Sequence, residues 1–92
     1  MLKQVRLSLR LTNKTFDSEI KDLIEACKRD LKLAGVVNIV DDDPLILRAV
    51  TLYCKGHFGF ADIGDNFLQS YEMLKISLCL AGDYNQSGGD TP

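Results

Sequence analysis

The stretch Pro44–Phe60 constrains the fold most strongly, because as a helix it would be apolar on almost every side. Its polar side chains Arg48, Thr51 and Lys55 recur at i, i+3 and i+7, so they occupy one narrow stripe. A helix of this kind belongs at the centre of a bundle, or between its own domain and a neighbouring copy. The residues alone therefore predict a small helical domain that associates with itself.

Length and charge are compatible with this prediction. The chain has 92 residues, of which 46% are hydrophobic and 26% charged, as in an ordinary globular domain. A domain of this size buries only about 60% of its unfolded surface, so oligomerisation would add stability. The net charge of -2 gives no general attraction to nucleic acid or anionic membranes. Residues 1–34 carry eight Lys/Arg against five Asp/Glu, and residues 35–92 carry three against eight. This asymmetry either serves head-to-tail or layered packing or has no function.

The cysteines are expected to be small buried hydrophobic residues in a reducing compartment. They are three in number, widely spaced and set in apolar patterns: Cys27, Cys54 and Cys79. No apolar stretch approaches the roughly 18 residues of a membrane span. Lys3, Arg6 and Arg10 interrupt the N-terminal stretch, which is unlike the apolar core of a signal peptide. We therefore expect a cytoplasmic protein with no membrane partner.

Residues 2–11 fit two templates. Apolar side chains alternate with polar ones as in a strand, but Leu2, Val5 and Leu9 also fall on one side of a short helix. Periodicity over ten residues leaves both open.

Residues 17–34 give the strongest helical pattern. Thr15 or Asp17 is expected to cap this helix, and Gly35 stands where a left-handed glycine would end it. Its apolar side chains recur at helical spacing: Ile20, Leu23, Ile24, Cys27, Leu31 and Ala34.

The segment 36–43 joins this helix to the central one. Residues 36–40 are apolar and are either extended or a packed connector. Asp43 and Pro44 predict an N-cap followed by the first residue of the central helix. Three consecutive aspartates do not converge on one ion, and the calcium-loop pattern is missing, so we predict no metal ligands here.

The last predicted helix has two apolar faces. Asp65 or Asn66 is expected to cap it and Gly82 to end it. One face holds Phe67, Tyr71, Leu74, Leu78 and Ala81. The other, on roughly the opposite side, is the candidate protein interface and holds Met73, Ile76 and Leu80. These three residues either contact another copy or another protein, or are covered by the N-terminal segment. Residues 1–84 would form one domain, and the polar residues 85–92 a flexible tail.

No pattern of catalytic residues is found. Phosphate-binding loops, nucleophile elbows and zinc-protease motifs are missing, and His57, the only histidine, is expected at a loop or helix end. We predict no catalytic residues, no cofactor, no metal and no enzyme activity.

One alternative function for a helical domain without catalytic residues is DNA binding. The protein would then be a small helical DNA-binding or regulatory protein of a prophage or mobile element. Its best recognition helix would begin with residues 44–47, Pro-Leu-Ile-Leu, where base readout needs exposed polar side chains. This argues against it.

Three segments carry a resemblance to a known family: Phe16–Val36, Asp42–Phe60 and Asn66–Tyr84, the last ending in Ala-Gly-Asp-Tyr. Together they resemble the small head–tail connector proteins of tailed bacteriophages, the DNA-packaging or head-completion adaptors. Residues 2–11 also fit the short first helix of that family, which favours a helix there.

The resemblance implies an all-α bundle of about four helices with a short N-terminal helix. It implies a homo-oligomeric ring that binds the phage portal protein, extends the DNA channel and docks the next tail or stopper protein. DNA would pass through without sequence-specific contacts. The protein would be made in the cytoplasm of the bacterial host and end in the virion neck, or be the product of an integrated prophage. The family has no catalytic or ligand residues to carry over.

Overall fold

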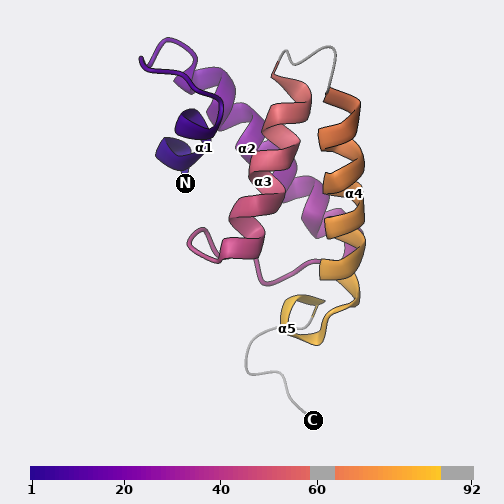
Figure 1. Cartoon of the computed structure of the whole chain (residues 1–92). Coiled ribbons are helices and arrows are strands. Elements are labelled where there is room, and N and C mark those ends of the chain that lie inside the picture. The colour runs from indigo at the N-terminus through magenta and orange to yellow at the C-terminus, as the bar shows by residue number, and fades with distance from the viewer. Residues whose placement is uncertain (59–63, 86–92) are drawn as a thin grey trace.

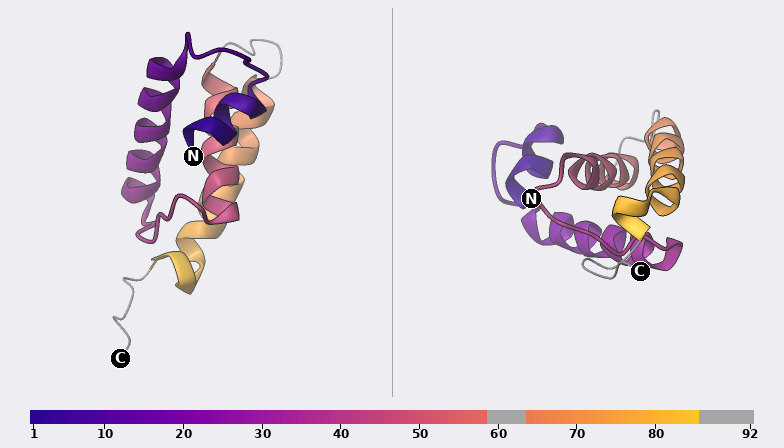
Figure 2. Two further views of the ribbon diagram at one scale, coloured as in Figure 1. Left: turned by 90° about the vertical axis from the view of Figure 1, so that its left-hand side faces the viewer. Right: turned by 90° about the horizontal axis from the view of Figure 1, so that it is seen from below.

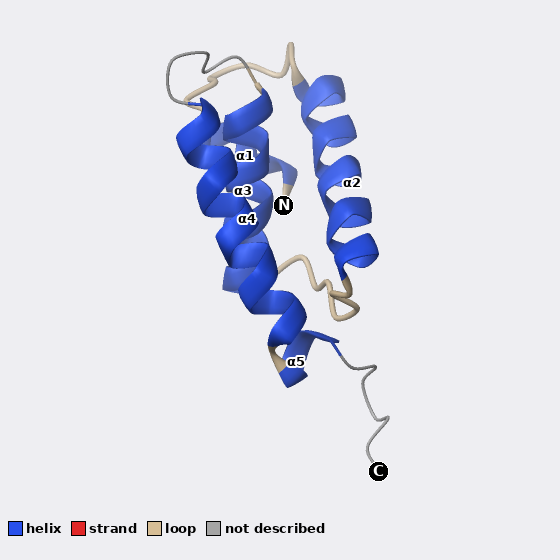
Figure 3. Ribbon diagram, turned by 90° about the vertical axis from the view of Figure 1, so that its right-hand side faces the viewer, coloured by secondary structure: helices blue, strands red, loops and turns tan. Residues whose placement is uncertain are grey.

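The computed structural model describes residues 1–58 and 64–85, and this part of the chain folds into five helices without a strand (Figures 1 and 3). The all-α prediction is confirmed, and residues 2–8 are helical. The helices are α1 Leu2–Ser8, α2 Asp17–Ala34, α3 Pro44–His57, α4 Gly64–Leu80 and α5 Gly82–Asn85. Residues 59–60 of the predicted central helix and residues 86–92 of the predicted tail lie outside the described part.

The central position of α3 is evident from its neighbours. It contacts α1, α2 and α4, and Figure 2 shows it between α1 and α4 with α2 lying across them. Most of its circumference is buried, as its sequence requires: Ile46, Ala49, Val50, Leu52 and Cys54. Arg48 in the predicted polar stripe is exposed, and Thr51 and Lys55 are half-buried.

The start of α3 is fixed by Asp43, as predicted. Its Oδ1 accepts hydrogen bonds from the backbone N–H groups of Leu45 at 2.8 Å and Ile46 at 3.4 Å, and Pro44 follows at the first helical position. The hydroxyl of Tyr84 donates to the same residue, with its oxygen 2.9 Å from Oδ2. Asp43 therefore caps α3 and ties the C-terminal turn to it.

The predicted cap of α2 is wrong. Phe16 occupies the N-cap position, and no side chain caps this end. The carboxylate of Asp17 instead accepts a hydrogen bond from Arg6 Nε at 2.9 Å, which joins α2 to α1. At the other end Gly35 has φ of 109°, a left-handed conformation that favours glycine, so the predicted C-terminus is confirmed.

The predicted ends of α4 are also wrong. The helix begins at Gly64, so Asp65 lies in its first turn rather than at the cap. It ends at Leu80, and Gly82 opens the short helix α5. The side chain of Asn85 donates to the carbonyl of Cys79 at 3.0 Å, which closes the end of α4 from α5. Asn85 is the last residue of α5, so its predicted place in the flexible tail is wrong.

Two of the three cysteines are buried as predicted. Cys27 and Cys54 are fully buried, and burial raises the pKa of each thiol to about 12. Cys79 is only partly buried, because it lies at the border between the two faces of α4. All three are free thiols.

Candidate protein interface

The three predicted interface residues form an exposed apolar stripe on α4, here called the outer stripe. Their exposed fractions are 72% for Met73, 55% for Ile76 and 76% for Leu80. Spacings of three and four residues place them on one side of the helix. The N-terminal alternative is not what the structure shows, because α1 packs against α2 and α3 and leaves this side of α4 open (Figure 2).

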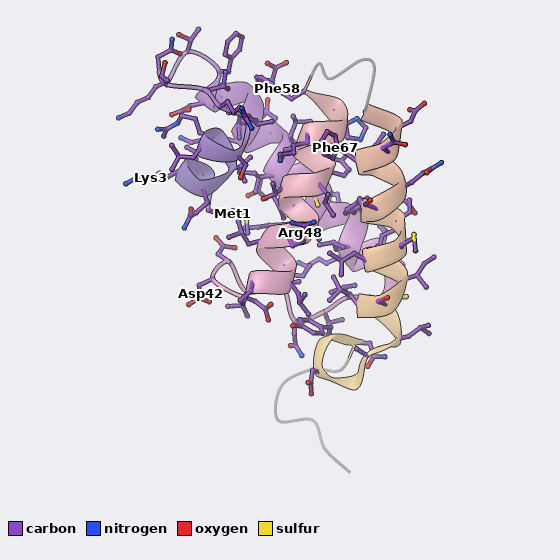
Figure 4. The ribbon with its side chains drawn as sticks, viewed as in Figure 1. Met1, Lys3, Asp42, Arg48, Phe58 and Phe67 are labelled. Carbon is purple, nitrogen blue, oxygen red and sulfur yellow. The ribbon has the colours of Figure 1, made fainter. Side chains whose placement is uncertain are left out.

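The opposite face of α4 packs inward. Tyr71 and Leu78 are buried, and Phe67 and Leu74 are partly buried against the core. Phe67 lies between α4 and α3 (Figure 4), where the ammonium of Lys55 is 5.3 Å from the centre of its ring. The predicted inner face is therefore correct for these four residues, whereas Ala81 lies beyond the end of α4.

A polar cluster anchors α4 to α2. The hydroxyl of Tyr71 donates to Asp30 Oδ2 at 2.5 Å, and Lys75 Nζ donates to the same oxygen at 3.0 Å. Lys75 also contacts Glu72 at 3.0 Å. Both donors come from α4 and meet one carboxylate of α2, so they resist rotation of α4 about its own axis.

The charges in this cluster support one another. Burial by itself would raise the pKa of Asp30, but the hydrogen bonds from Tyr71 and Lys75 outweigh it and hold the pKa below its ordinary value. Burial and the bond to Asp30 raise the pKa of Tyr71 far above its usual range. At neutral pH a neutral phenol and an ammonium therefore both donate to an ionised carboxylate.

The surface beside the outer stripe is hollowed and acidic. A shallow hollow of about 540 Å³ extends from the stripe toward the start of α4. Its lining combines apolar side chains with two carboxylates: Asp65, Leu68, Gln69, Glu72 and Met73.

A second exposed apolar position was missed by the sequence reasoning. Leu33 is 83% exposed on the outer face of α2, among basic side chains. The signal was in the sequence, because Leu33 stands out of phase with the apolar side of that helix. Val37, Val40 and Leu45 are exposed on the nearby connector and the start of α3.

Comparison of the sequence with protein families gives the assignment. The profile of the family described as "Phage connector protein" matches residues 1–85. The chain belongs to the phage connector protein family. This confirms the resemblance carried by the three segments named above. No curated protein and no solved structure matches the chain.

In this phage connector protein, the residues weighed for catalysis or metal binding make contacts within the fold. His57 is the last residue of α3, as predicted, and its ring centre lies 4.4 Å from that of Tyr53. Asp41 pairs with Lys28 at 2.7 Å. Within residues 1–58 and 64–85, no group of three or more possible ligands gathers around a metal site. None of the helices described there is both long and apolar enough to cross a membrane.

Proposed function

We propose that the protein is a structural head–tail connector, a head-completion adaptor that assembles as a ring on the phage portal. The ring extends the DNA channel and docks the next tail or stopper protein. The match to the connector family over residues 1–85 supports this role. Subunits made in the host cytoplasm become part of the virion neck, and no catalytic step is involved.

The observation that carries assembly is the outer stripe. Three large apolar side chains on one face of α4 leave apolar surface in water that a partner would cover. The cluster at Asp30 holds α4 in one orientation, so little conformational freedom remains to be lost when a partner binds. We assign Met73, Ile76 and Leu80 to an interface between proteins of the neck.

DNA in this proposal passes through the channel without base readout. In the alternative DNA-binding role, α3 would be the recognition helix, but Ile46 in its first turn is buried. Purified protein should therefore bind free duplexes weakly, without sequence preference and with strong salt dependence.

The test is negative-stain microscopy of the protein mixed with purified portal rings of the same phage. The wild-type protein should add a ring of density to one end of the portal. Ile76→Asp should remove that density while its circular dichroism spectrum stays helical. Ser70→Asp, an exposed position of α4 outside the stripe, is the matched control and should bind normally.

Two results would overturn the proposal. Portal rings that gain no density from the wild-type protein would exclude the portal-bound adaptor. Tight binding to one preferred duplex sequence would favour the DNA-binding alternative. If Ile76→Asp bound as well as wild type, the role of the outer stripe in the neck would be wrong.

A further inference from the structure

The outer face of α2 is a second surface with the features of a protein interface. Leu33 projects from it, and an open hollow of about 500 Å³ lies alongside. The lining of this hollow is largely basic: Glu25, Lys28, Arg29, Lys32, Leu33 and Ile39. We call Arg29, Lys32 and Leu33 the basic face of α2.

Charge distinguishes this face from the outer stripe of α4. Two carboxylates, Asp65 and Glu72, flank the stripe and its hollow, and the nearby ammonium of Lys75 is already bound to Asp30 and Glu72. Arg29 and Lys32 flank Leu33. The molecule thus carries two surfaces of opposite charge. The outer stripe of α4 is apolar with an acidic border, and the basic face of α2 has an apolar residue with a basic border. Two stripes packed on each other would instead bring like charges together.

The two surfaces also lie at the same level along the bundle. α2 and α4 run toward the same end of the bundle, with α2 oblique to α4, and α3 runs the opposite way (Figure 1). Tyr71 and Lys75 both reach Asp30, which sets residue 30 of α2 level with residues 71–75 of α4. Residue 30 is thus level with about residue 73, the midpoint of residues 71–75. Arg29, one residue earlier in α2, is therefore about level with Glu72, one residue earlier in α4. About one turn further along both helices, Leu33 is level with Ile76.

We propose that the outer stripe of α4 packs on the basic face of α2 of a second copy of this chain. The inference rests on the ring of the proposed function, and it takes the ring axis to be parallel to α4. Rotation about such an axis leaves heights unchanged, so Leu33 of one copy meets Ile76 of the next, and Arg29 meets Glu72. The interface is heterologous, since each copy offers one surface of each kind, and heterologous contacts form a ring when the rotation between copies closes.

Thiol cross-linking tests this pairing. The background variant is Cys79→Ser, because the other two cysteines are buried with a pKa of about 12 and react slowly. In this background, one chain carries both Leu33→Cys and Ile76→Cys. This double variant is treated with a short bismaleimide, at high protein concentration and again on portal rings. A ladder of covalent oligomers on a denaturing gel is expected.

Three controls define the geometry. Ile76→Cys alone should give no dimer, and a dimer would instead indicate that two stripes pack together. Leu33→Cys mixed with Ile76→Cys should stop at a covalent dimer. Leu33→Cys combined with Ser70→Cys, on the same helix outside the stripe, should give no ladder.

The outcomes separate this inference from the proposed function. Normal density on the portal without a Leu33–Ile76 ladder would overturn the inference and leave the connector role intact. A ladder in solution together with no portal binding would support the interface and overturn the portal-bound role. Neither ladder nor portal density would overturn both.

Discussion

Helices α3 and α4 are both rich in apolar residues, but only α3 has them covered by its own chain. α3 lies between α1 and α4 and also contacts α2, so neighbours surround it. α4 packs on α3 and α2 with one face, and its other face holds Met73, Ile76 and Leu80 in the open. The apolar content of a helix shows how much surface must be buried. The position of the helix in the fold determines whether the same chain or a partner buries it.

The largest expected effect on stability is that of Ile46→Ala in α3, compared with the matched substitution Ile76→Ala in α4. Ile46→Ala in α3 should lower the free energy of unfolding by about 2–5 kcal/mol, because it removes a fully buried side chain and leaves a cavity. The matched change Ile76→Ala in α4 should stay within about 0.5 kcal/mol. Urea denaturation followed by circular dichroism, at low protein concentration, measures both.

Equal losses for the two variants would contradict the comparison. They would mean that the outer stripe is covered within a single copy. Repeating the Ile76→Ala measurement at several protein concentrations separates a contribution from assembly, because only that contribution depends on concentration.

Local chemistry made part of this fold predictable. Asp43 followed by Pro44 specifies a helix start with bonds only two and three residues away, and the left-handed turn at Gly35 is equally local. The failures involve partners further along the chain, eleven residues apart in one case and six in the other. Asp17 does not cap α2 because Arg6 engages it, and Gly82 does not end the helical region because Asn85 reaches back to Cys79. Neither contact leaves a pattern in the nearby sequence.

The interface residues were predictable as apolar but not as exposed. The wheel positions of Met73, Ile76 and Leu80 show a second face on α4, but its cover depended on where residues 2–8 pack. Leu33 was missed for another reason: a single apolar side chain among lysines and arginines is ordinary on a helix surface. It gains meaning only when the fold places it level with Ile76.

The next largest effect concerns how α4 is held in place. Tyr71→Phe removes the hydrogen bond to Asp30 while keeping the ring buried. A bond to a charged group contributes about 1.5–3 kcal/mol, and the lower end, about 1.5 kcal/mol, is expected because Asp30 is 38% exposed to water. Thermal and urea unfolding would measure the loss. A smaller loss for Tyr71→Phe than for the surface change Ser70→Ala would show that the bond adds nothing.

The smallest expected effect is a pH dependence of this same anchor. The pKa of Asp30 in the folded protein lies below its ordinary value of 3.8, so the folded state favours the charged carboxylate. The resulting stabilisation is present above the unfolded-state pKa and is lost as the pH falls through the folded one. Since Asp30 is partly exposed, we expect less than about 1 kcal/mol. Asp30→Asn, compared with wild type by urea unfolding between about pH 6 and pH 2, should remove this acid-dependent part and leave the rest of the pH profile. An unchanged slope below about pH 4 would show that carboxylates other than Asp30 determine the acid dependence of stability.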